Sequence, residues 1–599
     1  MSEADSAIVL SDSGPSVHRE RLCKLLDFFA IPYQVQPDGW EPSSHSAGTP
    51  VHPDRYVVLA PICALADALR CAGGTIEQIP ALWHGATAVY LYATDDTATC
   101  SAALSVVTGS TSCRIVPLAA GELSVRISKR FPDLGGAMSG LTARMRAGPR
   151  DQVCGVDEAA GGVERILDTE MGTLFFSFRQ YGLQIFVNSS SEIPDVAAPS
   201  KGRWFDVRDD FGACVPLVMF LKWAFRDVGW QPRESGACLI IDDPLLKHHY
   251  GFFDFGLVER LMRERRFTTN IAFIPWNVRR TSLAIAKVIV ASEGRFSIST
   301  HGCDHTGAEF GVKSIVLLNA KLSLTKQRME HHFQRTGVQH ECIMVFPQGV
   351  FSAASLRALQ QNQFLAAVNT EVLPVDGDQD GPALADVWGT ALLSYASFPL
   401  FTRRYPGLGL ENFAFDILLG KPCLIGEHHT FFRDGGVRAA EFIDALNALN
   451  VHLEWQPLGK VIRRAYQWRR VASDALHIRM FANELELENE DDSEQTYVIE
   501  KADHRSVGVQ AVLTDRGPVA WKRDADRIVT TVQLRPGDET RVRVLYAPPA
   551  EAAAYRCSPL EVVQTAVRRY GSEFRDNVLS RYEGLSTLTA FARSIVRKR

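Results

Sequence analysis

The feature that most constrains the fold of this 599-residue chain is an alternation of strand-like and helix-like patterns over residues 237–449. Apolar runs of strand length at 239–243, 269–274 and 296–300 alternate with stretches of helical periodicity such as 313–335. This alternation predicts parallel strands, because a parallel strand is reached through a crossover that is usually a helix. Over about 230 residues it favours a (β/α) barrel, complete or partial, with the active site at the carboxyl ends of its strands.

Polar side chains follow these strands at the points where they end. Asp242 and Asp243 close the first run, and a later run delivers His301 and His305 in an H-x-x-x-H motif. Because the carboxyl ends of parallel strands gather on one side, we expect these side chains to lie close together. If the segment after Thr300 is helical, the spacing of the two histidines also places them on one helix face.

Two imidazoles and one carboxylate form a ligand set suited to a divalent metal ion, and hydrolysis also needs groups that move protons. The pattern therefore predicts one divalent metal ion bound by Asp243, His301 and His305. Asp242, one residue from a ligand, is placed to accept a proton from metal-bound water. An isolated Asp-Asp or H-x-x-x-H is more often structural, but their joint occurrence at strand ends favours a metal site.

At these motifs the chain resembles the polysaccharide deacetylase (NodB-homology) family of metal-dependent amide and ester hydrolases, over residues 237–465 only. That family carries a strand-terminal Asp-Asp, an H-x-x-x-H, a Pro-containing loop and a late strand that ends in His. The same motifs follow in the same order here: Asp242-Asp243, His301 and His305, Phe346-Pro347-Gln348-Gly349, and His428-His429.

The resemblance implies a central barrel of the polysaccharide deacetylase type and a carbon–nitrogen (amide) hydrolase of the carbohydrate esterase type. Such an enzyme removes an acyl group, N-acetyl above all, from an amino sugar or glycan intermediate. Zinc is the favoured metal, with cobalt, nickel, iron and manganese left open. The implied roles are catalytic base for Asp242, metal ligands for Asp243, His301 and His305, and general acid for His428 or, one residue further from the strand, His429.

Two departures from the family pattern keep a second function open. The family has Thr-Phe-Asp-Asp-Gly where this chain has Ile-Ile-Asp-Asp-Pro at 240–244. Its third motif also holds an arginine that orients the base, and Val345 stands about there. The missing arginine and the flanking regions favour the alternative of a non-catalytic metal- or carbohydrate-binding scaffold protein of a polysaccharide biosynthesis pathway.

Four residues near the predicted mouth are candidates for substrate binding: Tyr250, Trp276, Pro347 and Gln348. The aromatic rings, and Glu309 beside them, could contact a sugar, although aromatic residues at such a mouth are equally often packed beneath a lid. Within the histidine motif, Asp304 is expected at most to support a metal ligand without binding the ion itself. Cys303 is expected to be a packing residue and not a ligand.

The rest of the chain divides by pattern into further regions. Alternating strands and helices predict an open α/β domain before the barrel, and short alternating runs predict a β-sandwich after it. The basic amphipathic tail is expected to dock on its own protein rather than on an anionic membrane. The predicted domains are 1–120 (open α/β, flavodoxin-like), 121–232 (mixed α/β bridging region), 233–471 (deacetylase-like barrel), 472–548 (β-sandwich) and 549–599 (helical tail).

The composition excludes some classes of partner. With 64 basic and 69 acidic residues, the net charge of −5 provides no field that would attract nucleic acid. No secretory signal or membrane-length apolar run is recognised, and the twelve cysteines lack C-x-x-C spacing. We therefore expect a cytoplasmic protein without a transmembrane segment, whose partner is an acetylated sugar or glycan and whose oligomeric state these patterns do not define.

Overall fold

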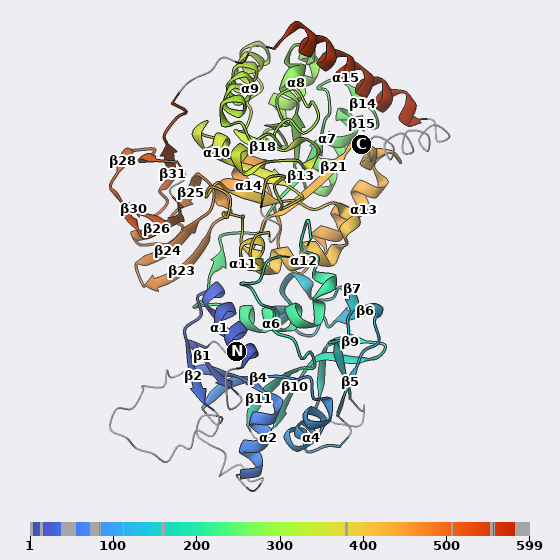
Figure 1. The fold of residues 1–599 in the computed structure, drawn as a ribbon, viewed down its shortest axis with the longest axis vertical. Helices are drawn as coiled ribbons and strands as arrows, with labels where there is room; N and C mark the ends of the chain where they lie inside the picture. The colour runs from blue at the N-terminus through green and yellow to red at the C-terminus, as the bar shows by residue number, and fades with distance from the viewer. Residues whose placement is uncertain are drawn as a thin grey trace.

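The chain folds into three regions, of which two are stacked along its longest axis and the third lies beside the upper one (Figure 1). A mixed sheet forms the lower half, a parallel α/β region forms the upper half, and a pair of β-sheets lies beside the upper region. The computed structural model describes residues 4–11, 16–37, 55–71, 73, 83, 85–111, 113–156, 162–180, 182–200, 202–377, 381–504, 507–550, 555 and 557–581.

The N-terminal region is built on one eleven-stranded sheet. Its first five strands in spatial order pair in parallel, and the others pair antiparallel. Because β4 pairs with β11, the predicted boundary at residue 120 falls inside this sheet. In spatial order the strands are β2 (Tyr33–Pro37), β1 (Ser6–Ser11), β3 (Tyr56–Pro61), β4 (Ala86–Tyr92), β11 (Leu183–Asn188), β10 (Gly172–Gln180), β9 (Glu164–Thr169), β6 (Gly121–Ile127) and β7 (Thr142–Ala147), with β5 (Arg114–Pro117) and β8 (Gln152–Gly155) beside β10.

Helices cover both faces of this sheet, which explains why its parallel strands are apolar on both sides. Helices α2 (Ile62–Cys71) and α4 (Thr97–Thr108) bury one face, and α1 (Val17–Phe29) and α6 (Phe211–Ala224) bury the other. Helix α6 is buried almost throughout because it also packs against α12 (Leu410–Leu419) of the upper region.

The upper region contains a sheet of eight parallel strands. This confirms the parallel strand–helix order. Among the described strands, the two edge strands are connected only by a single bridge, between Arg404 and Ile425. The ladder is therefore not continuous around the sheet, and the complete barrel stays a prediction. The order is β20 (Leu400–Thr402), β19 (Ala366–Asn369), β18 (Ile343–Val345), β17 (Phe296–Thr300), β16 (Thr269–Phe273), β13 (Gly236–Asp242) and β21 (Cys423–His428), with β22 (Glu454–Trp455) beside β13.

Helices and short connections surround this sheet, and a two-stranded hairpin lies above the end of β13. The hairpin consists of β14 (His249–Tyr250) and β15 (Phe253–Asp254). The helices are α7 (Phe255–Arg265), α8 (Leu283–Ala291), α9 (Ile315–Thr336), α10 (Ala353–Gln361), α11 (Leu384–Trp388), α13 (Val437–Asn447) and α14 (Leu458–Arg464), with the 3-10 turns η4 (Pro275–Arg280), η5 (Pro347–Gly349) and η7 (His429–Phe432).

Two further sheets, of six and four strands, share one apolar core beside the upper region, which is the arrangement of a β-sandwich. The first contains β12 (Gln231–Pro232), β23 (Gln467–Ala472), β24 (Ala475–Met480), β26 (Gln495–Ala502), β30 (Arg527–Leu534) and β29 (Trp521–Asp524). The second contains β25 (Glu484–Glu488), β31 (Glu539–Tyr546), β27 (Val509–Thr514) and β28 (Gly517–Val519).

The last helix, α15 (Pro559–Asn577), crosses the top of the upper region (Figure 1). The predicted docking of the tail on its own protein is therefore observed for this helix, whereas the basic end at 597–599 lies outside the described residues. Within the part of the chain that the structure describes, no helix is both long and apolar enough to cross a membrane.

Candidate metal centre

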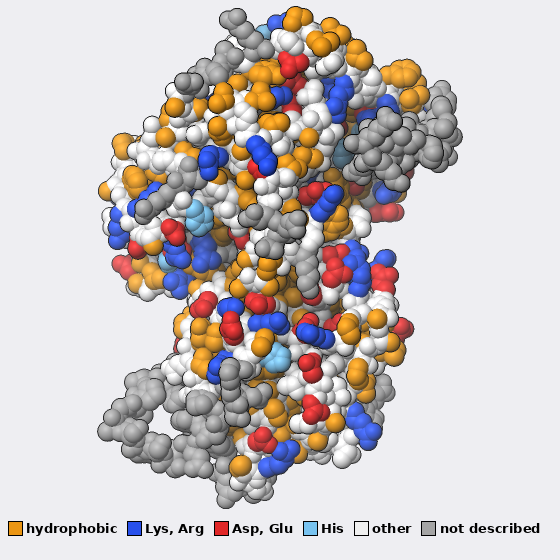
Figure 2. All heavy atoms as spheres, in the orientation of Figure 1, with side chains coloured by type: hydrophobic (Ala, Val, Ile, Leu, Met, Phe, Trp, Pro, Cys, Tyr) orange, Lys and Arg blue, Asp and Glu red, His pale blue; other side chains and the backbone are white. Residues whose placement is uncertain are grey.

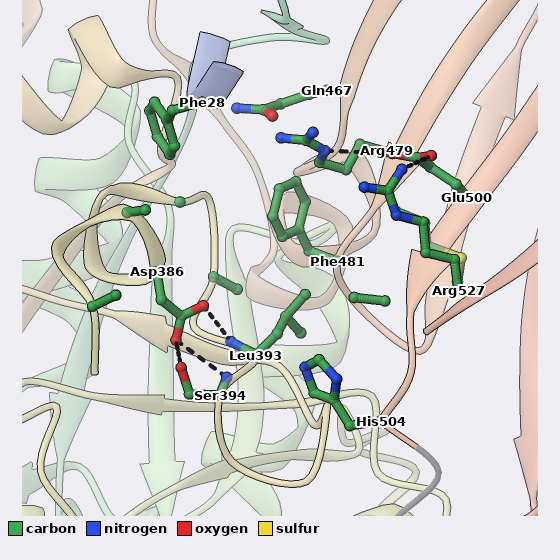
Figure 3. Close-up of a pocket in the computed structure, with 16 residues that line it drawn as sticks. Phe28, Asp386, Leu393, Ser394, Gln467, Arg479, Phe481, Glu500, His504 and Arg527 are labelled. Atoms are coloured by element: carbon green, nitrogen blue, oxygen red, sulfur yellow. Dashed lines mark hydrogen bonds and ion pairs between the residues drawn. The ribbon is translucent and has the colours of Figure 1, made fainter. Parts of the chain in front are cut away.

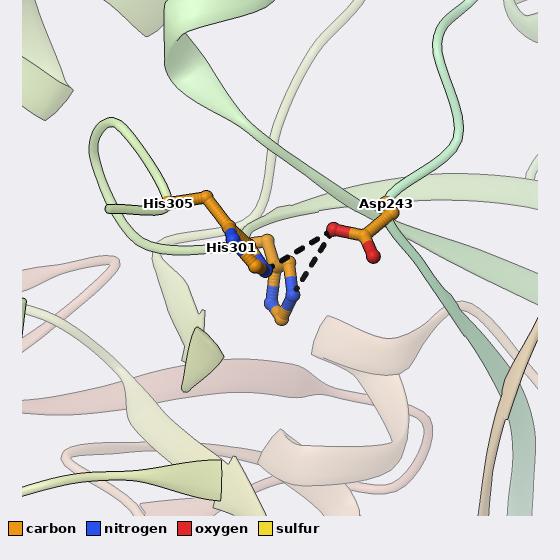
Figure 4. Close-up of side chains that lie close together, drawn as sticks. All are labelled: Asp243, His301 and His305. Atoms are coloured by element: carbon orange, nitrogen blue, oxygen red, sulfur yellow. Dashed lines mark ion pairs between the residues drawn. The ribbon is translucent and has the colours of Figure 1, made fainter. Parts of the chain in front are cut away.

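Three side chains predicted as metal ligands lie together at the carboxyl ends of β13 and β17 (Figure 4). One ligand atom from each of Asp243, His301 and His305 lies within 4.8 Å of the others. The Oδ1 atom of Asp243 is 3.6 Å from Nε2 of His301 and 3.2 Å from Nε2 of His305. Residues separated by almost sixty positions in the sequence thus form one compact cluster, as the strand order predicts.

The chemistry of the cluster fits a divalent cation. Oδ1 of Asp243 is buried and accepts no hydrogen bond from the described residues, which is costly for a carboxylate oxygen unless a cation satisfies it. The Nδ1 of His301 lies 2.9 Å from the backbone carbonyl of Val345. Donation from Nδ1 to this carbonyl leaves Nε2 free as a ligand, in the way that hydrogen-bonded histidines usually bind metals.

The protonation of His305 also suits a ligand. Burial lowers the pKa of His305 to about 4, although the nearby Asp243 carboxylate acts in the opposite direction. The ring is therefore neutral at pH 7, as metal binding requires. Burial would raise the pKa of Asp243, but the neighbouring histidines outweigh it and lower that pKa.

The histidines lie on an irregular loop, so the helix considered after Thr300 is not formed. The reason is Glu309, whose buried carboxylate accepts hydrogen bonds from the backbone N–H of Cys303, at 2.9 Å, and of His305, at 2.8 Å. The N–H of His305, which would bond to the carbonyl of His301 in a helix beginning after Thr300, is thereby withdrawn from helical bonding. Glu309 also pairs with Lys321 at 3.2 Å, so it organises the loop from beneath and is not a sugar contact at the mouth.

Two of the ligand residues have an uncommon backbone conformation. Asp243 has φ of 79° and His305 has φ of 55°, which is the left-handed region that non-glycine residues rarely adopt. Such conformations cost about 1–3 kcal/mol and persist only where the surrounding structure fixes them. Their occurrence at two of three ligands is typical of functional sites.

The neighbours of the loop behave largely as predicted. Asp304 is buried and pairs with Arg328 at 2.8 Å, which places its charge behind the loop. Cys303 is buried, and Arg328 donates to its Sγ at 3.3 Å. Neither side chain belongs to the cluster.

Asp242 is paired with an arginine that the sequence analysis missed. The guanidinium of Arg403, just beyond β20, donates to Oδ1 of Asp242 at 2.7 Å and to Oδ2 at 2.5 Å. Burial alone would raise the pKa of Asp242, but the charge of Arg403 outweighs it and holds that pKa well below its ordinary value. The arginine expected near Val345 is therefore supplied from a different strand. The only signal for it in the sequence is the Arg403-Arg404 pair that follows an apolar run.

The two late histidines lie in different surroundings. His428 is the ladder partner of Asp242 between β13 and β21, and its ring stacks on Tyr405 with the centroids 6.3 Å apart. His429 is buried beneath α15, where its Nδ1 accepts from the N–H of Phe252 at 3.4 Å and its Nε2 lies 3.7 Å from Asp576. His428 is therefore the histidine beside the two aspartates.

Of the four residues predicted to bind substrate, two contact α15. The hydroxyl of Tyr250 donates to Asp576 at 2.7 Å, and the ring of Trp276 lies edge-on to Tyr570 with the centroids 6.1 Å apart. Pro347 is buried against Gly302 of the histidine loop. Gln348 is exposed, and its Oε1 accepts from the N–H of Ala308 at 3.3 Å.

A separate cavity of about 360 Å³ lies between the β-sandwich and the upper region (Figure 3). No residue of the metal cluster lines it. Its charged groups are already paired: Glu500 lies 2.7 Å from Arg527 and 3.6 Å from Arg479, and Asp386 accepts from the N–H of Leu393 at 2.9 Å. It therefore offers no competing set of reactive groups.

Comparison with solved structures finds similar chains, all at low identity. The carbohydrate deacetylase Agd3 has 10% identity and a TM-score of 0.46, over 91% of this chain and 99% of that one. A CE4 family pseudoenzyme from Bacillus anthracis has 12% identity and a TM-score of 0.25, over 37% of this chain and 64% of that one. A family 4 carbohydrate esterase from Streptomyces lividans has 13% identity and a TM-score of 0.23, over 36% of this chain and 88% of that one.

All three TM-scores are below 0.5, so these similarities assign neither a fold nor an activity to this chain. No protein-family model and no curated protein matches the sequence. The function of this chain is therefore inferred from the geometry of the cluster.

Proposed function

We propose that this chain is a metal-dependent hydrolase that removes an N-acetyl group from an amino sugar or glycan intermediate. The observation that carries the proposal is the cluster of Asp243, His301 and His305 beside a second buried carboxylate, Asp242. Ligands, a base and a histidine acid on adjacent strand ends are the groups that amide hydrolysis requires.

Each residue has a defined part in the proposed reaction. A divalent ion, zinc by preference, held by the three ligands would polarise the amide carbonyl and lower the pKa of a nearby water. Asp242 accepts the proton of the attacking water at one carboxylate oxygen, while Arg403 fixes the plane of that carboxylate. His428 donates a proton to the leaving nitrogen, because it lies next to Asp242 on the neighbouring strand.

The position of Arg403 bears on the rival hypothesis of a non-catalytic scaffold. That hypothesis drew on the absence of an arginine near Val345, and the structure supplies an arginine to the base from another strand. An ion pair that fixes the carboxylate of the base is useful for catalysis. A scaffold that only binds metal or carbohydrate does not need one.

The test separates metal binding from turnover. Elemental analysis of the purified protein should give about one divalent metal ion per chain, lost in Asp243→Ala and His305→Ala. Acetate release from N-acetylated amino-sugar oligomers should disappear in Asp242→Asn, which keeps its metal. Asp96→Asn is the matched control, because Asp96 also follows a strand but only caps α4.

The outcomes discriminate between the two functions. Metal bound with no acetate release by the parent protein would favour the scaffold. No metal after reconstitution with zinc, cobalt or manganese would reject both the hydrolase and a metal-binding scaffold.

A further inference from the structure

Helix α15 lies directly over the metal cluster and anchors itself there with polar side chains. The guanidinium of Arg569 is 3.4 Å from Nδ1 of His305. Asp576 accepts from the hydroxyl of Tyr250 at 2.7 Å, and Asn577 accepts from the N–H of Gly251 at 2.6 Å. The inward face of the helix therefore occupies the space from which a substrate would reach the cluster.

A second set of contacts fixes the C-terminal half of the helix. Glu573 pairs with Lys247 at 2.8 Å and also with Arg280, whose guanidinium stacks on Tyr570 at 4.5 Å from the ring centroid. The helix is thus held on both sides of the cluster, by the β14–β15 hairpin and by η4.

The outward face of α15 is apolar. Apolar residues recur at helical spacing, and most of this stripe is more than half exposed: Leu560, Val563, Val567, Phe574 and Val578. Figure 2 shows hydrophobic side chains along the upper edge of the molecule, where α15 runs in Figure 1. An amphipathic helix on a globular protein normally buries its apolar stripe. Helix α15 instead contacts the protein with its polar face and exposes the apolar stripe.

The composition of the C-terminal segment indicates what covers the stripe. Residues 559–599 hold eight basic and four acidic side chains, whereas the whole chain has a net charge of −5. Arg568 and Arg581 are exposed on the helix and just beyond it. An apolar stripe flanked by arginines is the pattern of a helix that lies in the interface of an anionic bilayer.

We propose that α15 is a lid on the metal centre and that its apolar stripe binds the surface of an anionic lipid bilayer, which draws the lid away. The lid half of this inference rests on the proposed function, and the bilayer half does not. Release frees the ring of Tyr570 from Arg280 and Trp276 and adds it to the apolar face. The released helix therefore buries more apolar surface in lipid than the docked helix does, and lipid binding favours the open state.

The cavities beside α15 agree with a lid. One, of about 680 Å³, is lined by His249, Phe252 and Arg433, with Arg581 at its edge. Another, of about 800 Å³, is lined by Trp276 and Arg279, with Tyr570 of the helix as part of its wall. Tyr570 belongs to the helix and Arg581 follows it, so departure of this segment would widen both cavities and suit a chain-like glycan.

The bilayer half is tested by sedimentation of the full-length protein with vesicles. Binding is expected to vesicles of phosphatidylcholine mixed with phosphatidylglycerol, and to be about tenfold weaker or more for phosphatidylcholine alone. Val567→Glu with Phe574→Glu should weaken binding by about tenfold or more. Val437→Glu, at an exposed valine on α13, is the matched control and should bind like the parent.

The lid half is tested by hydrogen exchange and by zinc titration. The backbone N–H of Gly251, which donates to Asn577 at 2.6 Å, should lose protection when mixed vesicles are added, and Arg569→Gln with Asp576→Asn should show the same loss without lipid. This double variant should also bind zinc more tightly than the parent, because a guanidinium no longer faces the ligands.

Each contrary result rejects a defined part of the proposal. Equal binding of the Glu variant rejects the stripe as the lipid surface, and a concentration-dependent dimer lost in that variant assigns the stripe to a second copy instead. Unchanged protection of the Gly251 N–H on lipid rejects the lid. Vesicle binding with no zinc bound by any variant would reject the proposed function while leaving the bilayer surface intact.

Discussion

Arg403 contacts both carboxylate oxygens of Asp242, at 2.7 and 2.5 Å, and both side chains are almost fully buried. Breaking such a pair by removing one partner usually costs about 3–5 kcal/mol, because the other charge remains buried without compensation. The pair therefore controls both the stability of the site and the proton affinity of its base.

Replacing Arg403 with Met should move the acid limb of the pH–rate profile to higher pH. With the guanidinium present, the pKa of Asp242 lies below its ordinary value and the carboxylate is ionised throughout the neutral range. Without it, burial dominates and raises that pKa, so less of the base is ionised at a given pH. kcat/KM for acetate release, measured from pH 4 to pH 8, checks this.

Arg403→Lys keeps a charge and should shift the limb less. Asp242→Asn with Arg403→Met removes both charges and should recover most of the lost unfolding free energy, which separates misfolding from a changed base. An unshifted acid limb in Arg403→Met would contradict the assignment of Asp242 as the base.

The two late histidines should differ in their effects on turnover. His428→Ala should lower kcat by about a hundredfold to ten-thousandfold, as expected for loss of a general acid. His429→Ala should leave kcat within about tenfold but loosen α15, because His429 lies 3.7 Å from Asp576 of that helix. The reverse pattern would assign the acid to His429.

How much of this centre the sequence predicts depends on the range of each interaction. The aspartates and histidines are found because they follow apolar strands, and parallel strands bring their ends together. Arg403 is not found, because its role depends on which strand lies opposite Asp242, a long-range fact without a local pattern. The orientation of α15 on the protein is likewise not found, since periodicity defines two faces of a helix but not which one docks.

Residues 391–396 show how a side chain can prevent an apolar run from forming a strand. Residues 391–396 have the composition of a strand, yet they form a bridge residue followed by a turn. Asp386 accepts hydrogen bonds from the backbone N–H of Leu393, at 2.9 Å, and of Ser394, at 3.1 Å. These donors are thereby removed from the ladder, and the strand begins later, at Leu400.

Glu309→Gln should weaken metal binding without removing a ligand. The carboxylate holds the backbone of His305 and its neighbours, and Lys321 pairs with its charge. Loss of such a supporting group usually costs about 10- to 100-fold in metal affinity, which zinc titration by calorimetry would measure. Glu330→Gln, at an exposed position of α9, should bind zinc like the parent, and equal affinity in both variants would show that Glu309 is dispensable.

Gly302→Ala and Gly337→Ala form a matched pair that isolates crowding beneath the metal ligands. Their φ angles are 73° and 72°, so a side chain strains the backbone equally at both positions. A Cβ at Gly302 would lie 2.2 Å from Oε1 of Glu309 and 2.5 Å from Cγ of Pro347, whereas at Gly337 it would meet nothing within 4 Å. Gly337→Ala should therefore cost about 1 kcal/mol of unfolding free energy.

Gly302→Ala should cost about 1–3 kcal/mol more than this control, because it also displaces the carboxylate that holds the histidine loop. Urea unfolding of both variants measures the difference, and zinc titration should show weakened binding for Gly302→Ala alone. Equal losses of stability in the two variants would mean that Glu309 moves freely, and the histidine loop would then not be fixed from beneath by its carboxylate.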